Sequence, residues 1–245
     1  MTDANVRAIL LDIEGTTTPV AFVYEILFPY ARQHLAEFLR QRQQAARWTN
    51  LVADFRAEYV ADVVRGEAPP TWRNDSTDAQ FEPLMRYIHW LMDQDRKSTA
   101  LKSLQGEIWE AGYLSGRLRG EVYPDVAPAF ARWTKQQRRV YIYSSGSVLA
   151  QKLLFAHTTA GDLTGYLSGY FDTTTGAKRD AASYRSISQT IDLPPGEILF
   201  LSDVTAELAA AKTAGLQTTL CVRPGNAEGE SDWDASTRDL DAILP

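Results

Sequence analysis

The chain has 245 residues, of which 44% are hydrophobic and 23% are charged, and its formal net charge is −6 at pH 7. These proportions are typical of a globular protein and exclude a disordered chain, and the length suits one large domain or two smaller ones. The acidic net charge and the lack of a basic stripe of Lys and Arg residues argue against nucleic acid as a partner.

The first predicted strand lies near the N-terminus. Ala8–Leu11 is a continuous apolar run, with Arg7 before it and Asp12 after it. Runs of this length and character are typical of strands that are buried on both faces, as in a parallel sheet. We therefore expect a parallel sheet to which this strand belongs.

Residues 20–120 show a different pattern, in which apolar residues recur every three or four positions and no strand is evident. The three clearest sets are Leu51, Phe55, Tyr59 and Val63; Phe81, Leu84, Ile88 and Leu91; and Leu101, Leu104, Ile108 and Ala111. This spacing predicts helices with one apolar face. We therefore predict an all-helical domain over residues 19–120, inserted after the first strand and hinged at Gly15–Pro19 and Gly116–Pro124.

Three more apolar runs follow the insert. They are Val140–Tyr143, Ile198–Leu201 and Thr218–Val222. Between the last two, Val204–Ala214 has a helical pattern that ends before Gly215, a residue type that often terminates helices. This alternation predicts an α/β fold, with a doubly wound parallel-sheet (Rossmann-like) core made of residues 1–18 and 121–245. The polar segment Gly225–Ser236 is predicted to be a surface loop.

The sequence also predicts a cytoplasmic protein without membrane association. Its N-terminus lacks the basic flank and long apolar stretch of a signal peptide, and no apolar run is long enough to span a bilayer. Cys221 is the single cysteine, so the chain cannot form an internal disulfide. The three histidines are too scattered to suggest a zinc site.

Polar residues follow the predicted strands, and ligands of parallel sheets bind beyond the carboxyl ends of the strands. The segment Asp12–Thr17 follows the first strand, and Ser144–Ser147 follows the second. Ser202–Asp203 follows the third, with Glu207 one helical turn further on, and Thr173–Lys178 lies between the second and the third. Two carboxylates, a hydroxyl and a lysine are therefore expected at one edge of the sheet.

Taken one at a time, these residues have ordinary structural explanations. Asp12 and Asp203 could each cap a helix. The Ser144–Ser145 pair could do the same, and Lys178 could be a surface cation. Their order along the chain is more specific, because an acidic pair, a hydroxyl, a lysine and a final acid follow one another. In all four motifs the chain resembles the haloacid-dehalogenase-like phosphohydrolases.

This resemblance implies a phosphohydrolase that needs magnesium, with one ion per chain, and that works through an aspartyl phosphate on Asp12. The metal site would consist of Asp12, Glu14 and Asp203, with Glu14 contributing its main-chain carbonyl. These are all hard oxygen ligands, which magnesium prefers. Glu14 would also act as the general base that activates water.

The same resemblance puts Ser144, Ser145 and Lys178 in contact with the phosphorylated substrate. The Ser144 hydroxyl and the main-chain amides near Ser145 would hold phosphoryl oxygens. Lys178 is expected to be catalytic as well, because its ammonium would stabilise the charge on the phosphoryl group in the transition state.

One departure from the common pattern of the group narrows the resemblance. In Leu11–Pro19 the second acid is Glu14 where the group usually has Asp, and Gly-Thr-Thr follows it. This motif resembles the enolase-phosphatases of methionine salvage, also called acireductone synthases. Further segments that resemble this family are Tyr141–Ser147, Phe171–Lys178, Phe200–Val204 and, in the insert, Asp95–Lys102.

The family resemblance implies a substrate and a reaction. The enzyme would enolise 2,3-diketo-5-methylthiopentyl-1-phosphate and then remove the phosphate, giving the acireductone 1,2-dihydroxy-3-keto-5-methylthiopentene. It would be a monomer whose helical insert is a cap that excludes water from the site. In the cap, the Arg96–Lys97 pair either contacts the substrate or starts a helix. We expect Glu14 to be the enolisation base, with Lys178 or a cap residue as the alternatives.

Several rival interpretations stay open at this point. The nearest is a relative with the same fold that acts on another small phosphorylated metabolite. A dehalogenase would not need magnesium. A signalling receiver domain carries its acceptor Asp on an internal strand and has no long insert, whereas Asp12 follows the first strand. A non-catalytic metabolite-binding module would leave Asp12 and Glu14 without a purpose.

Overall fold

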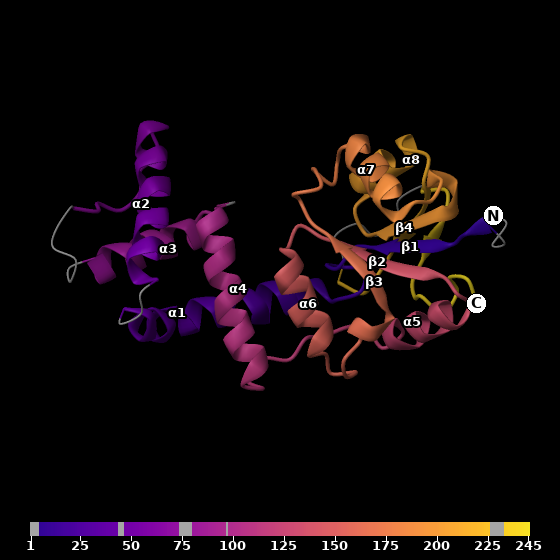
Figure 1. Ribbon diagram of the computed structural model, residues 1–245, viewed down its shortest axis with the longest axis horizontal. Coiled ribbons are helices and arrows are strands. Elements are labelled where there is room, and N and C mark those ends of the chain that lie inside the picture. The colour runs from indigo at the N-terminus through magenta and orange to yellow at the C-terminus, as the bar shows by residue number, and fades with distance from the viewer. Residues whose placement is uncertain (1–4, 44–46, 74–79, 97, 226–232) are drawn as a thin grey trace. The chain divides into compact units, whose positions relative to one another are not determined.

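The computed structural model of the protein describes residues 5–43, 47–73, 80–96, 98–225 and 233–245. The chain forms two compact units, whose elements are labelled in Figure 1. Unit 1 comprises Met1–Ile26 and Tyr113–Pro245, and unit 2 comprises Leu27–Gly112.

Unit 1 is built on a six-stranded parallel sheet with the strand order β3-β2-β1-β4-β5-β6. The strands are β1 (Ala8–Leu11), β2 (Arg139–Tyr143), β3 (Leu167–Phe171), β4 (Ile198–Ser202), β5 (Gln217–Cys221) and β6 (Ser236–Thr237). Every residue of β1 and β4 is buried, as expected for central strands that are covered on both faces. Leu11 of β1 pairs with Ile142 of β2 and Leu201 of β4, so these strands end at nearly the same level.

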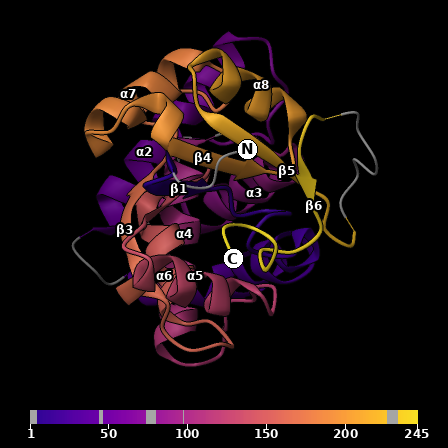
Figure 2. The same ribbon diagram turned by 90° about the vertical axis from the view of Figure 1, so that its right-hand side faces the viewer.

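Helices cover both faces of this sheet. They are α5 (Val126–Lys135), α6 (Val148–Ala156), α7 (Ala181–Ile191) and α8 (Thr205–Thr213). Figure 1 and Figure 2 show α7 and α8 on one face and α5 and α6 on the other. On the first of these faces, Leu10 of β1, Phe200 of β4 and Tyr184 of α7 belong to one buried hydrophobic cluster. The core is therefore doubly wound, as predicted.

The elements of unit 2 that the structure describes are helices, as predicted for the insert. They are α1 (Phe28–Arg42), α2 (Trp48–Val64), α3 (Phe81–Asp93) and α4 (Thr99–Leu114), and a π-helical turn at Phe22–Leu27 leads into α1. The predicted apolar faces contribute buried residues to the core, which are Phe55, Leu84, Ile88, Leu91, Leu101, Leu104 and Ile108. Val63 and Ala111 are exposed, because each lies near the end of its helix. Together the sheet and these helices confirm the predicted fold class.

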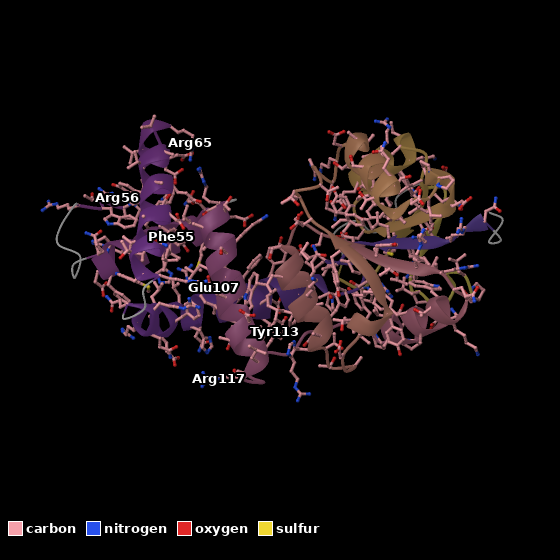
Figure 3. All side chains as sticks on the ribbon, in the orientation of Figure 1. Phe55, Arg56, Arg65, Glu107, Tyr113 and Arg117 are labelled. Atoms are coloured by element: carbon pink, nitrogen blue, oxygen red, sulfur yellow. The ribbon has the colours of Figure 1, made fainter. Side chains whose placement is uncertain are left out.

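A buried carboxylate links the helices of unit 2. Asp62 of α2 is 1% exposed and accepts hydrogen bonds from Tyr87 Oη and from Arg96 Nη2, both at 2.6 Å. Arg65, which Figure 3 labels near the end of α2, also pairs with Asp62. A buried charge is strongly destabilising unless partners compensate for it, so these contacts fix the adjoining helices. Of the Arg96–Lys97 pair, Lys97 lies outside the described residues.

Two strands of unit 1 are absent from the sequence-based prediction. β3 lies at the edge of the sheet, and its sequence Leu-Ser-Gly-Tyr-Phe contains one buried residue, Phe171. An edge strand is covered less than a central one, so it needs no continuous apolar run. β6 contains two residues and overlaps the end of the predicted loop Gly225–Ser236, of which residues 226–232 lie outside the described part.

The limits of the two units differ from the expected hinges. Gly15–Pro19 and Gly116–Pro124 both lie inside unit 1, and Thr16–Thr18 is fully buried. The functional division into a core of residues 1–18 and 121–245 and a cap of residues 19–120 stays a prediction. Within the part of the chain that is described, no helix combines the length and apolar character needed to cross a membrane.

Candidate active site

The direction of winding changes between β1 and β4, because the chain proceeds from β1 to β2 on one side and later crosses to β4 on the other. Ligands of such sheets bind beyond the carboxyl ends of the strands at this switch point. Asp12 follows β1 directly, Ser202 is the last residue of β4, and Asp203 comes next. Ser144 follows β2, and Lys178 lies in the segment between β3 and α7.

A buried lysine connects the end of β1 with the start of α8. Lys178 Nζ lies 2.6 Å from Asp12 Oδ1 and 2.6 Å from Glu207 Oε2, in the first turn of α8. Ser202 Oγ lies 3.1 Å from Glu207 Oε2 and 3.4 Å from Asp12 Oδ2. Asp12 is 5% exposed and Lys178 is 7% exposed, so both charges are largely removed from bulk water. The four side chains form one buried polar cluster.

Lys178 keeps its positive charge in this cluster. Burial lowers the pKa of its ammonium, but Asp12 and Glu207 more than offset the burial, and the net shift of the pKa is upward. The ammonium also lies 5.8 Å from the centre of the Tyr143 ring, at a distance where a cation is attracted to the aromatic face. At neutral pH Lys178 is therefore a cation and a hydrogen-bond donor, and a poor base.

Asp203 is the second carboxylate that the sequence predicts at this edge. Burial raises the pKa of Asp203 to about 7, and the negative charge of Asp12 is the next largest cause. A divalent cation would favour the ionised form of Asp203. The described residues include no group of three or more His, Cys, Asp or Glu side chains that could hold a metal. Two carboxylates and a main-chain carbonyl, such as that of Glu14, form an all-oxygen set that fits magnesium.

A tight turn after β1 carries Glu14. The carbonyl of Ile13 accepts hydrogen bonds from the amides of Thr16–Thr18, at 3.2, 3.0 and 2.9 Å in chain order. Gly15 has a φ of +68°, in the left-handed region that glycine adopts without strain. The three threonines are buried, whereas Glu14 is partly exposed. The turn is therefore held rigidly while its acidic side chain stays accessible.

Arg223, just beyond β5, anchors this turn. Its Nε donates to the carbonyl of Thr16 at 3.1 Å, and its Nη1 pairs with Asp125 Oδ2 at 2.7 Å. The guanidinium carbon lies 4.4 Å from the centre of the Tyr123 ring, and the Tyr123 amide donates to the carbonyl of Thr17 at 3.0 Å. Arg223 is 5% exposed, so these contacts tie the turn after β1 to the segment that begins α5.

The segment after β2 offers hydroxyl and amide groups. Ser144 is 4% exposed, and its Oγ accepts a hydrogen bond from the Gly146 amide at 3.1 Å. Ser145 is exposed, and the Ser147 side chain caps α6 by accepting from the Ala150 amide. Amides at the start of a helix attract anions. The two predicted substrate-binding serines therefore lie beside groups that can bind a phosphate.

Sequence reasoning gave no role to Glu207, Ser202 or Arg223. The four-residue spacing from Asp203 to Glu207 brings the two acids to the start of the same helix. This spacing is the sequence feature that could have indicated a role for Glu207. Arg223 lies just beyond a predicted strand, so the rule that identified the other candidates also applied to it. The contact of Glu207 with Lys178 is a long-range one that no local pattern indicates.

Comparisons with known proteins agree with these motifs. Residues 6–215 match a family model described as haloacid dehalogenase-like hydrolase. The enolase-phosphatase E1 of Synechococcus elongatus is 50% identical to the chain over 230 residues, which is 94% of each protein. The enolase-phosphatase E1 of Yersinia enterocolitica is 47% identical over 218 residues, which is 89% of each protein.

Solved structures extend the comparison to three dimensions. The UTR4 protein of Saccharomyces cerevisiae matches with a TM-score of 0.80 and 34% identity, over 98% of this chain and 100% of the other. Two L-2-haloacid dehalogenases match with a TM-score of 0.54 at 16% and 20% identity, which supports the fold alone. The chain therefore belongs to the enolase-phosphatase family of the haloacid-dehalogenase-like hydrolases, as its motifs predicted.

Proposed function

We propose that the protein is an enolase-phosphatase of methionine salvage. It enolises 2,3-diketo-5-methylthiopentyl-1-phosphate and then removes the phosphate, which gives the acireductone 1,2-dihydroxy-3-keto-5-methylthiopentene. Relatives that are 46% to 50% identical over most of the chain carry the name enolase-phosphatase. The observation that best supports the chemistry is the buried Asp12 carboxylate, which contacts Lys178 and interacts with Asp203 at the switch point of the sheet.

Asp12 acts as the nucleophile. Its Oδ1 accepts hydrogen bonds from Lys178 Nζ at 2.6 Å and from the Ile13 amide at 2.8 Å, which restricts rotation of the carboxylate. A carboxylate oxygen attacks phosphorus, the bond between phosphorus and the ester oxygen breaks, and an aspartyl phosphate forms. Magnesium, when bound by Asp12, Asp203 and the carbonyl of Glu14, supplies positive charge that offsets the repulsion between carboxylate and phosphate.

Lys178 and the serines after β2 bind the phosphoryl oxygens. Lys178 stays protonated because of its carboxylate partners, so it can donate to an oxygen that gains negative charge in the transition state. The Ser144 hydroxyl and the amides near Ser145 would bind further oxygens. Groups that are held in place before the reaction do not have to reorganise during it, which lowers the barrier.

Glu14 carries out the proton transfers. The proton that leaves during enolisation is on the carbon that bears the phosphate ester, so its base must lie beside the phosphate. Asp12 is engaged at phosphorus, and Lys178 is a poor base because its pKa is raised. Glu14 is partly exposed on the rigid turn, and its side chain is one methylene longer than the usual Asp. It passes this proton to the ester oxygen that leaves phosphorus, which restores the Glu14 carboxylate, and Glu14 then activates the water that hydrolyses the aspartyl phosphate.

Membership of the enolase-phosphatase family supports further properties of the protein. The protein acts as a cytoplasmic monomer with one magnesium ion per chain. Residues 1–18 and 121–245 form the catalytic core, and residues 19–120 form a cap that shields the reaction from water. Its partner is a small phosphorylated diketone, and neither nucleic acid nor a membrane is involved.

The direct test is to incubate the protein with the diketone phosphate and magnesium. Release of inorganic phosphate and the ultraviolet absorbance of the acireductone should rise together, and a chelator should abolish both. A higher kcat/KM with another small phosphomonoester than with the diketone phosphate would instead identify a haloacid-dehalogenase-like phosphatase for that other metabolite.

A further inference from the structure

The main chain at Gly176–Lys178 is held by side-chain hydroxyl groups. Each of the three consecutive carbonyls accepts a hydrogen bond from a different hydroxyl. The pairs are Tyr143 Oη with Gly176 at 3.0 Å, Ser183 Oγ with Ala177 at 2.8 Å, and Tyr184 Oη with Lys178 at 2.7 Å. We call Tyr143, Ser183 and Tyr184 the hydroxyl clamp.

The hydroxyl clamp is itself rigid. Tyr143 is the last residue of β2, and Ser183 and Tyr184 lie in the first turn of α7. The exposed fractions of the three residues are 0%, 2% and 0%. The two tyrosine rings pack edge to face at a centroid distance of 5.6 Å, and the Tyr184 ring lies 5.1 Å from that of Phe200 on β4. The donors are therefore fixed by the sheet and by the helix that covers it.

Gly176 shows how closely the segment approaches the clamp. A Cβ atom at this position would lie 2.2 Å from Ser183 Oγ, far inside van der Waals contact. The φ of Gly176 is +143°, a conformation that other residues rarely adopt. Glycine therefore allows the main chain to come within hydrogen-bond distance of the clamp.

The clamp hydroxyls remain donors at working pH. Burial raises the pKa of Tyr143 and also that of Tyr184, so neither hydroxyl ionises in the neutral range. Buried hydrogen bonds to a main-chain carbonyl add about 1 kcal/mol each to stability, but their main consequence here is geometric.

We propose that the hydroxyl clamp is a set of positioning residues for the reaction, because it fixes the main chain of Lys178 so that Nζ reaches both Asp12 and Glu207. The kinetic part of this inference rests on the proposed function. When the phosphoryl group arrives, the ammonium must turn from the Asp12 carboxylate to phosphoryl oxygens. With the main chain held, this change needs only side-chain rotation, and little orientational freedom is lost.

Amine acetylation tests the geometry without any substrate. Wild-type protein is treated briefly with acetic anhydride, and the acetylation of Lys178 is measured by mass spectrometry relative to Lys135, an exposed lysine of α5. In the Tyr143→Phe/Tyr184→Phe double variant, both rings remain and two clamp hydrogen bonds are lost. We expect acetylation of Lys178 to rise roughly tenfold, because the segment opens more often.

Tyr141→Phe is the matched control. Tyr141 lies on the same strand as Tyr143 and packs in the same buried cluster, and this substitution removes a hydroxyl that does not belong to the clamp. Its Lys178 acetylation should equal that of the wild type. With the diketone phosphate as substrate, clamp variants should show a kcat lowered roughly tenfold and a KM within about twofold, since positioning affects the transition state most. The single variants Tyr184→Phe and Ser183→Ala answer the same question if the double variant does not fold.

Unchanged acetylation of Lys178 in all clamp variants would contradict the proposal, and so would an equal rise in Tyr141→Phe. A rise in KM alone, with kcat preserved, would also contradict it. A wrong substrate assignment would leave even the wild type without turnover but would not affect the acetylation result, so the two failures are distinguishable.

Discussion

At the scale of single residues, three carboxylates share the end of β1 and the start of α8, and their charges are compensated unequally. Asp12 and Glu207 each contact the ammonium of Lys178 at 2.6 Å. Asp203 is influenced most by burial and next by the charge of Asp12, and both raise the pKa of its carboxyl. The ionisation of the Asp203 carboxyl is therefore sensitive to pH near neutrality and to a bound cation.

Asp203 should make the metal-free protein less stable as the pH rises. Its pKa is 3.8 in the unfolded chain and about 7 in the folded protein, so between these values the folded state holds an extra proton. The stabilisation is complete below pH 4 and is lost towards pH 7. Relative to Asp203→Asn, the free energy of unfolding should fall by about 2 kcal/mol across this range, after allowance for solvent screening. Urea titrations without divalent cations measure it, and a pH-independent difference between the two proteins would refute it.

Glu14→Gln should block enolisation while keeping the turn intact. The amide has the same shape but cannot accept the proton, so exchange of the carbon-1 proton for solvent deuterium should fall by at least about a hundredfold. Nuclear magnetic resonance of the substrate follows this exchange separately from phosphate release. Exchange at nearly the wild-type rate would shift the assignment to Lys178 or to a cap residue.

At the scale of elements, the site depends on how loops are tied to one another. The turn after β1 is fixed by its own hydrogen bonds, by Arg223 beyond β5 and by Tyr123 before α5. Asp125 Oδ2 accepts a hydrogen bond from Arg223 and another from the Leu240 amide at 2.5 Å. Asp125 therefore links the C-terminal segment to Arg223. Substitutions of Arg223, Tyr123 or Asp125 should therefore alter the conformation of the turn after β1.

Arg223→Met should destabilise unit 1 by about 3 kcal/mol, because it leaves the buried carboxylate of Asp125 without its cation. Changing Asp125 to Asn in the same protein should recover part of the loss, since the uncompensated charge is removed. Urea unfolding of the wild type, both single variants and the double variant measures the coupling. Strictly additive effects would show that the ion pair contributes nothing of its own.

Central strands were the most predictable elements. β1 and β4 are buried throughout, so their continuous apolar runs could be recognised from the sequence. The edge strand β3 carries Ser168 and Gly169, and its weaker burial removes that signal. The strand-end rule likewise identified Asp12, Asp203 and the segment of Lys178.

The long-range contacts of the site could not be predicted from the sequence. Lys178 meets Glu207 because two separate segments pass the same point, and no local spacing encodes this. The hydroxyl clamp also depends on a long-range contact, since Tyr143 is far from Gly176 in the chain. Tyrosine in a buried strand is explained by packing alone, and its hydroxyl gains a role only when the fold brings a carbonyl to it.

At the scale of the whole molecule, two compact units are joined by two passages of the chain, at residues 26–27 and 112–113. If residues 19–120 act as a cap, substrate binding must change the freedom of the segments predicted to be its hinges, although these lie inside unit 1. Arg117, which Figure 3 shows just past the end of α4, is exposed and lies in the predicted hinge Gly116–Pro124.

Trypsin cleavage after Arg117 should slow several-fold when magnesium and vanadate, a phosphate analogue, are bound, because closure restrains the segment. Cleavage after Arg65, an exposed site at the end of α2, is the control and should change little. Mass spectrometry of the early fragments measures both rates. Equal rates at Arg117 with and without the ligands would argue against a closing cap.

The proposed mechanism requires that Asp12 becomes phosphorylated during turnover, so the aspartyl phosphate should be trapped when the reaction is stopped early. Protein mixed with magnesium and the diketone phosphate is quenched in acid within one turnover, digested and examined by mass spectrometry. We predict a phosphoryl group on the peptide that contains Asp12, and neither this adduct nor phosphate release in Asp12→Asn, whose near-isosteric amide should leave the fold intact. Substantial phosphate release by Asp12→Asn, or a phosphoryl group found on another residue, would show that Asp12 is not the nucleophile.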